Sequence, residues 1–123
     1  MPSHDLGLTL IPESTPLSVA ENQLSAGSVT IETPYPFRDC AVVDGRLVVI
    51  FDYMSKKTGV FPNLVAYDGR GQHLWTAPNP SNASTDAYVN FISLEPLVVG
   101  NFAGYAVTIS PRSGDVLGSK FTK

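Results

Sequence analysis

The sequence has 123 residues, of which 43% are hydrophobic and 15% are charged, and its formal net charge is −3. This length suits one domain, and the composition excludes a disordered chain, because it supplies enough apolar surface for a core. The sequence contains neither a basic stripe for phosphate neutralisation nor an apolar run of about 20 residues. Nucleic-acid binding and membrane insertion are therefore not expected.

Cys40 is the single cysteine, so no disulfide can form within the chain. Residues 1–15 lack the basic and apolar segments of a secretory signal. A lone cysteine favours a reducing compartment. We therefore expect a cytoplasmic protein.

Residues 1–27 form the least regular part of the sequence. Leucines at positions 6, 8 and 10 alternate with polar or small residues, as in a short strand. Farther on, Thr15 and Pro16 precede LSVAENQL and predict one short helix, with Thr15 as its N-cap. Residues 28–32 (SVTIE) then predict a strand that ends before Pro34 and Pro36.

The strongest local signal is a β-hairpin around Asp44 and Gly45. These two residues are a preferred pair for a two-residue type I′ turn, in which both central residues need positive φ. The turn pairs Val43 with Arg46, Ala41 with Val48, Asp39 with Ile50, and Phe37 with Asp52. Both faces of this hairpin are apolar at mid-strand, so we expect it to lie centrally and to be covered on both sides.

Three further hairpins follow along the chain. Strands are predicted at 63–68 and 72–77, at 87–93 and 97–102, and at 104–110 and 116–121. The polar, proline-rich segment 78–86 is the longest predicted loop. The sequence thus predicts a single all-β domain over 1–123. We expect an antiparallel meander of about eight strands, open or sandwich-like, with a less regular segment at 1–27 and at most one short helix.

Two of these hairpins resemble each other. LVAYDGRGQHLW (64–75) and YAVTISPRSGDVL (105–117) each combine an apolar strand, a polar turn with a late glycine, and an apolar return. Gly71 and Gly114 lie 43 residues apart, and repeats of about 40–45 residues are typical of β-propeller blades. Because a closed propeller needs at least about four blades, this chain cannot close a ring alone.

Several segments together resemble a family of small bacterial β-proteins. They are Pro36-Phe37-Arg38, VVIFDY (48–53), NLVAYDGRGQHLW (63–75), NFAGYAVTI (101–109) and SGDVLGSKFTK (113–123). Some members of that family are immunity proteins encoded beside contact-dependent or other polymorphic toxins. The resemblance covers residues 34–123 and implies non-catalytic neutralisation of a toxin in the cell that makes it.

Charge and aromatic content select candidate partner-binding residues. Residues 1–54 hold seven acids against two bases, a net charge of −5, which indicates a cationic partner. Asp39 and Asp52 are expected on one hairpin face, about 7–8 Å apart, where they either form an acidic spot or mark the strand ends. The predicted partner-binding residues, including two tyrosines near strand ends, are Asp39, Asp44, Asp52, Tyr53, Asp86 and Tyr88.

Other chemistry has weaker support in the sequence. Cys40, His73 and an aspartate could form a nucleophilic set, but Cys40 is expected to point into an apolar face and His73 into solvent. Two histidines and one cysteine fall short of any zinc-site spacing, so no metal or other cofactor is expected. Trp75 is interpreted as a core residue, with an exposed interface anchor as the alternative.

The leading functional hypothesis is therefore an immunity protein without enzymatic activity. It would bind a cationic bacterial toxin domain, such as a nuclease, as a monomer or a weak homo-oligomer. The alternative is a small β scaffold or ligand-binding module that associates into a larger propeller-like assembly.

Overall fold

The computed structural model describes residues 9–20, 22–33, 35–52, 62–79 and 86–121. These described residues form eleven β-strands and no helix, so the predicted all-β antiparallel class is confirmed. None of them belongs to a helix able to span a membrane. The strands are β1 (Leu17–Ala20), β2 (Gln23–Ala26), β3 (Val29–Glu32), β4 (Phe37–Val43), β5 (Arg46–Phe51), β6 (Leu64–Tyr67), β7 (His73–Thr76), β8 (Tyr88–Leu94), β9 (Leu97–Asn101), β10 (Tyr105–Ile109) and β11 (Val116–Phe121).

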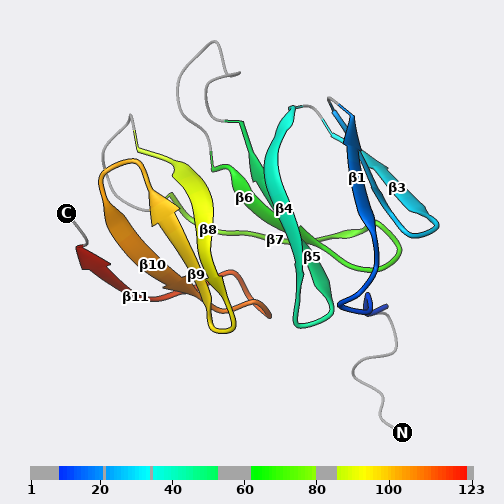
Figure 1. Cartoon of the computed structure of the whole chain (residues 1–123). Coiled ribbons are helices and arrows are strands. Elements are labelled where there is room, and N and C mark those ends of the chain that lie inside the picture. Colours follow the sequence, from blue (N-terminus) through cyan, green and yellow to red (C-terminus); the bar gives the residue numbers. More distant parts are fainter. Residues whose placement is uncertain (1–8, 21, 34, 53–61, 80–85, 122–123) are drawn as a thin grey trace, which may run out of the picture.

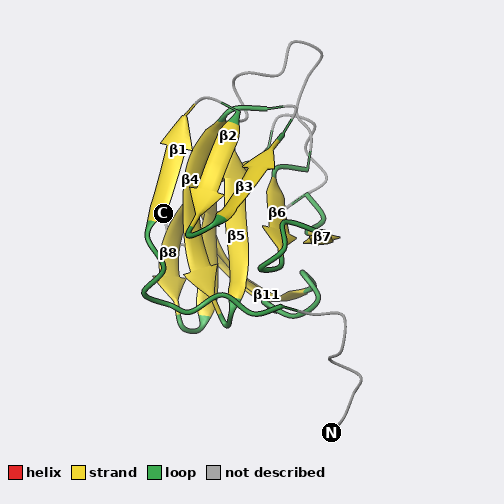
Figure 2. Ribbon diagram, turned by 90° about the vertical axis from the view of Figure 1, so that its right-hand side faces the viewer, coloured by secondary structure: helices red, strands yellow, loops and turns green. Residues whose placement is uncertain are grey.

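The strands form three antiparallel sheets, each of which follows the order of the chain. The first sheet contains β1 to β3, the second contains β4 to β7, and the third contains β8 to β11. Figure 1 shows the sheets side by side with the second in the middle. Seen from the right-hand side, the first sheet lies in front of the second (Figure 2).

The predicted central hairpin is confirmed. Asp44 and Gly45 both have positive φ, at 50° and 76°, and the pairs Val43–Arg46, Ala41–Val48 and Asp39–Ile50 form as expected. One prediction is wrong: a bulge between Phe37 and Asp39 shifts the register, so that Phe37 pairs with Phe51 and not with Asp52.

The second sheet is buried on both faces, as the two apolar faces of its hairpin predicted. Val48 and Ile50 pack with Leu97 and Val107 in a core against the third sheet. Leu47 and Val49 pack with Leu24 and Ile31 in a separate core against the first sheet. Alternation of side chains along each strand sends neighbouring residues to opposite cores. The hydrophobic runs of this sheet therefore serve two interfaces.

Asn63 joins the second sheet to the third. Its side chain is fully buried, and its amide nitrogen donates to the carbonyl oxygens of Phe51 and Tyr88 at 3.0 and 2.8 Å. Its amide oxygen accepts from the Tyr88 backbone nitrogen at 3.1 Å. One amide thus satisfies three backbone groups that would otherwise be buried without partners.

The helix predicted after Thr15 and Pro16 is wrong. Residues 17–20 and 23–26 form a β-hairpin, to which β3 adds a third strand. Leu24 and Ala26 are buried at alternate positions, which is the period of a strand and not of a helix. This extra sheet also explains why the structure has eleven strands and not about eight.

Glycines at equivalent turns show that the sheets repeat one unit. Gly27, Gly71 and Gly114 have φ of 61°, 82° and 79° and lie in the last turn of the first, second and third sheet. A Cβ atom on Gly71 would meet Ile31 of β3 at 3.3 Å, and one on Gly114 would meet Trp75 of β7. The last strands β3, β7 and β11 are therefore equivalent. Among the described residues, the first sheet has three strands and no equivalent of β4 and β8.

Candidate binding surface

Exposed apolar side chains concentrate on the third sheet. Among the described residues, seven of the nine large hydrophobic side chains that are exposed belong to residues 88–121. They are Ile92, Leu94, Phe102, Tyr105, Val116, Leu117 and Phe121. An exposed apolar surface of this kind is typical of a contact site for another macromolecule.

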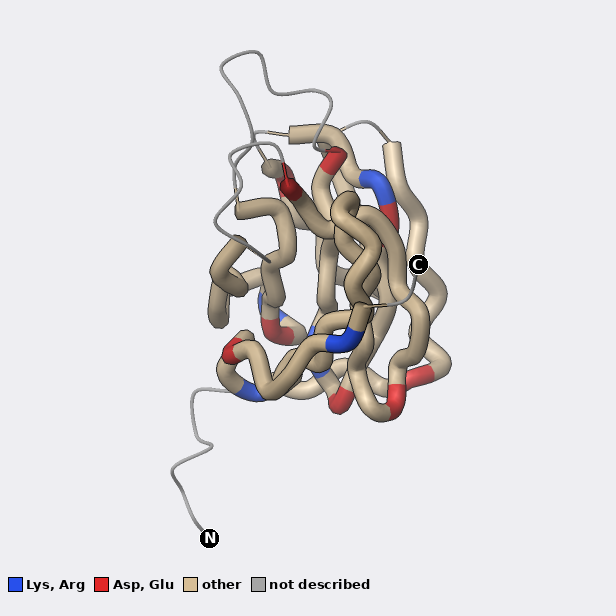
Figure 3. Tube along the Cα trace, turned by 90° about the vertical axis from the view of Figure 1, so that its left-hand side faces the viewer, with Lys and Arg blue, Asp and Glu red and all other residues tan. Residues whose placement is uncertain are grey.

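The outer face of the third sheet, which points away from the second sheet, is small and weakly polar. A Cβ atom on Gly100 would meet the side chains of Asn90 and Ile92, so all three lie on this outer face. With the strand pairings, the third-sheet outer face consists of Asn90, Ile92, Val98, Gly100, Ala106, Thr108, Gly118 and Lys120. Lys120 is the only charged residue in β8 to β11, and Figure 3, which views this side, shows few charged positions over the sheet.

A pocket of about 460 Å³ opens at the turn end of the third sheet. We call it the turn pocket. Its floor contains Val43, Leu97 and Ile109, which are at most 4% exposed. Leu94, Pro96, Pro111 and Leu117 line it with further apolar groups, and Thr108 also lines it. A volume of this size lies within the range of pockets that bind small groups.

Three carboxylates surround the apolar interior of the turn pocket: Glu13, Asp44 and Glu95. Asp44 is shared between two cations, because its Oδ2 lies 3.2 Å from Arg46 Nη1 and 3.4 Å from Arg112 Nε. Neither Glu13 nor Glu95 forms an ion pair within the described part of the chain. The pocket therefore combines apolar walls with two available negative charges.

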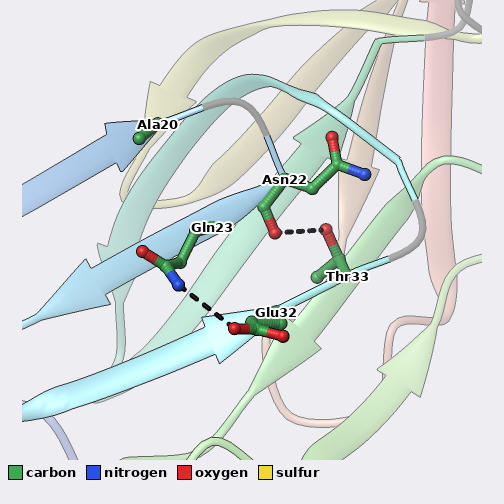
Figure 4. Close-up of a pocket in the computed structure, with 5 residues that line it drawn as sticks. All are labelled: Ala20, Asn22, Gln23, Glu32 and Thr33. Carbon is green, nitrogen blue, oxygen red and sulfur yellow. Dashed lines mark hydrogen bonds between the residues drawn. The ribbon is translucent and has the colours of Figure 1, made fainter.

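A second hollow lies between strand ends of the first sheet and is lined by Ala20, Asn22, Gln23, Glu32 and Thr33 (Figure 4). Gln23 Nε2 donates to Glu32 Oε2 at 3.2 Å, and Thr33 Oγ1 donates to the Asn22 carbonyl oxygen at 3.4 Å. These polar groups already form hydrogen bonds with one another, so they are less available to a ligand than the carboxylates Glu13 and Glu95 of the turn pocket.

The predicted acidic residues do not form one site. Asp44 lines the turn pocket, whereas Asp39 and Asp52 lie toward the other end of the same hairpin. Asp39 accepts a hydrogen bond from the Cys40 backbone nitrogen at 2.9 Å and pairs with Ile50, but the bulge beside it pairs Phe37 with Phe51, so Asp52 does not take its expected place opposite Phe37. Tyr53 lies outside the described residues.

Asp86 and Tyr88 are buried, which corrects their prediction as surface contacts. Asp86 is 2% exposed and accepts hydrogen bonds from Asn101 Nδ2 at 2.9 Å and from the Ala103 nitrogen at 3.2 Å. Tyr88 is fully buried, and its hydroxyl donates to the Pro78 carbonyl oxygen at 3.0 Å. Burial, with a smaller contribution from Asp86, raises the pKa of Tyr88 to about 12. Both residues therefore hold the third sheet in place.

Cys40 and His73 are not brought together. They lie in β4 and β7, the two edge strands of the second sheet, and these strands are about 14 Å apart by strand spacing. Burial, and secondarily Asp39, raises the pKa of the Cys40 thiol, which opposes thiolate formation. His73 bonds to the Thr76 hydroxyl at 2.8 Å, and no group of three or more metal-ligating side chains occurs among the described residues.

The core interpretation of Trp75 is confirmed. Trp75 is 6% exposed, packs in the core between the second and third sheets, and donates from Nε1 to the Pro111 carbonyl oxygen at 2.8 Å.

Sequence reasoning missed Glu13, Leu94, Glu95 and Leu117 as lining residues of a common pocket. Only the turn residues Leu94 and Glu95 had a signal, namely their place in a predicted hairpin turn.

Residues 14–121 match a family model described as Domain of unknown function (DUF7957). The chain belongs to this family. No curated protein matches the sequence.

Among solved structures, the fold is similar to part of BamB from Moraxella catarrhalis, with a TM-score of 0.59 and 16% sequence identity. The match covers 96% of this chain but only 36% of the BamB chain. At this identity the similarity concerns the fold alone. It agrees with the sequence repeat in indicating propeller-like sheets.

Proposed function

We propose that this protein is a non-catalytic module that binds a basic protein through the turn pocket and the neighbouring apolar side chains of the third sheet. The observation that carries the proposal is the pocket itself, where Glu13 and Glu95 flank an interior formed by Leu94, Leu97 and Leu117. An arginine or lysine side chain fits this chemistry, because its aliphatic stem packs on apolar walls while its charge meets a carboxylate.

Neutralisation of a cationic toxin is a narrower form of this proposal. It is supported by the family resemblance, by the net charge of −3, and by the carboxylates of the turn pocket. Charge complementarity would accelerate the encounter, and burial of Leu94 and Leu117 would slow dissociation. Cytoplasmic location and action without a cofactor belong to the same proposal.

The test is a titration with short arginine-containing peptides that carry a leucine on each side, followed by NMR chemical shifts. We expect shifts at Leu94, Leu97 and Leu117, and binding that weakens as salt is added. The double variant E13Q and E95Q removes both available charges and should lower affinity about fivefold, since exposed ion pairs contribute about 0.2–1 kcal/mol each.

E32Q is the matched control, because Glu32 is an exposed carboxylate on the first sheet outside the turn pocket. It should leave the affinity unchanged. Equal losses in both variants, or peptide shifts confined to other sheets, would contradict the site.

A second candidate function is assembly into a larger propeller-like structure. The outer face of the third sheet favours it. The equivalent face of the second sheet is covered, because the third sheet packs on it. Val98 and Ala106 occupy the positions that Val48 and Leu64 hold in the second sheet. In the described chain this face of the repeated unit is covered in one sheet and open in the next.

A further inference from the structure

In the described residues, the first sheet has three of the four strands of the repeated unit. Because β3, β7 and β11 are equivalent, counting back along each meander makes β2 equivalent to β6 and β10, and β1 equivalent to β5 and β9. β4 and β8 are each seven residues long and pair with β5 and β9. Within the part of the chain that the structure describes, no strand holds this position beside β1.

The open edge of β1 presents defined backbone groups. The Gly27 nitrogen donates to the Pro16 carbonyl oxygen at 3.3 Å, so residues 16 and 27 form a hydrogen-bonded pair of the β1–β2 ladder. Hydrogen-bonded pairs alternate along an antiparallel ladder. Ser18 and Ala20 therefore bond toward β2, whereas the N–H and C=O groups of Leu17 and Val19 point to the open edge.

Apolar side chains beside this edge are incompletely covered. Leu17 and Val19 pair with Ala26 and Leu24, and so share the face that packs on the second sheet. Val19 is nevertheless 45% exposed. In the equivalent strand β5, Val48 and Ile50 point toward the next sheet and are fully buried.

The neighbouring strand β4 shows the same incomplete cover. Phe37 and Cys40 are only half-buried, although both pack against the core between the first and second sheets. The corresponding side of β8 carries Tyr88, which is fully buried beneath β4 and its sheet. A strand in the missing position would cover Val19 together with these side chains of β4.

We propose that the edge of β1 binds an extended segment of a partner polypeptide, which adds to the first sheet as a fourth strand beside β1. The segment runs antiparallel to β1, as β4 and β8 run antiparallel to their neighbours. It carries apolar residues at alternate positions, because one of its faces meets Val19 and Phe37 while the other continues the polar outer face of the first sheet. Recognition by strand addition draws affinity from main-chain hydrogen bonds and specificity from alternate side chains.

This site is separate from the turn pocket, and it does not depend on the function proposed above. Its residues are Leu17 and Val19 of β1 with Phe37 and Cys40 of β4, none of which lines the turn pocket. A failure of one site therefore leaves the other intact, and the two are distinguished by where a probe binds.

The test uses a synthetic peptide of alternating valine and threonine with a lysine at each end, and amide hydrogen exchange of the full chain. We expect about tenfold or greater slowing of exchange at Leu17 and Val19, whose N–H groups face the edge. The amides of Ser18 and Ala20, already bonded to β2, should change much less. A peptide with proline at its centre should not protect these amides.

V19P is the decisive variant. Proline is tolerated on an edge strand where the N–H is not paired, so the free protein should fold as before. Loss of that N–H should weaken peptide binding about tenfold, the equivalent of about 1.4 kcal/mol. V19T keeps the donor and a branched side chain and should bind like the original protein.

The urea unfolding midpoint of V19P should match that of V19T, which verifies its fold. Equal binding of the valine–threonine peptide to V19P and V19T would overturn the proposal. Protection at the edge of β11 with none at β1 would overturn it as well.

Discussion

The first and third sheets lie at the two ends of the stack of three sheets, and their outer faces differ in chemistry. On the first sheet, Gln23 bonds to Glu32, and the hydroxyls of Ser25 and Thr30 lie 3.4 Å apart. On the third sheet, Ile92, Val98 and Ala106 occupy the outward positions and Lys120 is the only charge among the strands. Polar side chains that satisfy one another suit contact with water, whereas small apolar ones suit contact with protein. The stack therefore has a polar outer face on the first sheet and a small, mostly apolar outer face on the third.

The two end sheets also differ in how they are attached. A Cβ atom on Gly114 would lie 2.5 Å from Trp75 Cε3, so the third sheet is packed closely on the second. At the interface between the first and second sheets, a Cβ atom on the equivalent Gly71 would lie 3.3 Å from Ile31 Cγ1, so these two sheets are packed less closely. Asn63 and Tyr88 add buried hydrogen bonds at the third sheet.

The largest expected effect is that of G114A. Both the positive φ of 79° and the contact with Trp75 oppose a methyl group, and together they should lower the free energy of unfolding by about 3 kcal/mol. G71A, at a similar φ of 82°, should cost about 1 kcal/mol, because its contact with Ile31 of the first sheet is wider and backbone strain is the main opposition. Urea unfolding of both variants measures this difference. Equal costs would mean that the third sheet is not held more tightly than the first.

An intermediate effect is expected at alkaline pH. Below about pH 10 Tyr88 keeps its proton in both states, whereas between about pH 10 and its folded-state pKa of about 12 only the unfolded chain ionises. Stability should therefore fall through this window as pH rises, by about 2–3 kcal/mol at its upper end.

Y88F should remove most of this alkaline loss, because phenylalanine cannot ionise. Y67F is the matched control, since burial also raises the pKa of Tyr67, a half-buried residue at the core beside the first sheet. Denaturation midpoints of the two variants between pH 9 and 12 provide the measurement. If Y67F removed more of the alkaline loss of stability than Y88F, the larger contribution assigned to Tyr88 would be wrong.

The smallest effect on stability is expected on the two outer faces. A Cβ atom on Gly118 meets nothing within 4 Å, and Ser18 is exposed on the first sheet. G118E and S18E should each change the unfolding free energy by less than about 0.5 kcal/mol. If the third-sheet outer face docks onto another β-sheet, sedimentation over a range of concentrations should show weaker association for G118E alone. Unchanged association in G118E would argue against the assembly function.

Local sequence signals predicted a large part of the fold. Asp44 and Gly45 set the central hairpin because a type I′ turn needs two positive φ values, and these are local properties. The matching glycines at positions 71 and 114 indicated a repeated unit, and both occupy equivalent turns. The hairpin after Pro16 was missed because a short LSVAENQL segment fits a helix as well as a strand when only local preference is considered.

The candidate site could be predicted far less well. Asp86 and Tyr88 stood near a predicted strand end and looked exposed, yet neighbouring sheets bury them and use their polar groups. The turn pocket unites Glu13, Asp44, Glu95 and Leu117, which are far apart in the chain. No spacing rule connects them, because they meet through the stacking of two sheets and the course of an N-terminal segment.

The sequence by itself determined the strand class, the tight turns and the two-sided burial of the central hairpin, because turn geometry and alternation act between near neighbours. The tertiary structure alone decided which outer face stays apolar, which carboxylates share a pocket, and which strand keeps an open edge. Those features depend on how three similar sheets stack and on the first sheet having three strands, not four, in the part of the chain that the structure describes. Interactions between distant segments, which leave no local pattern, determine both.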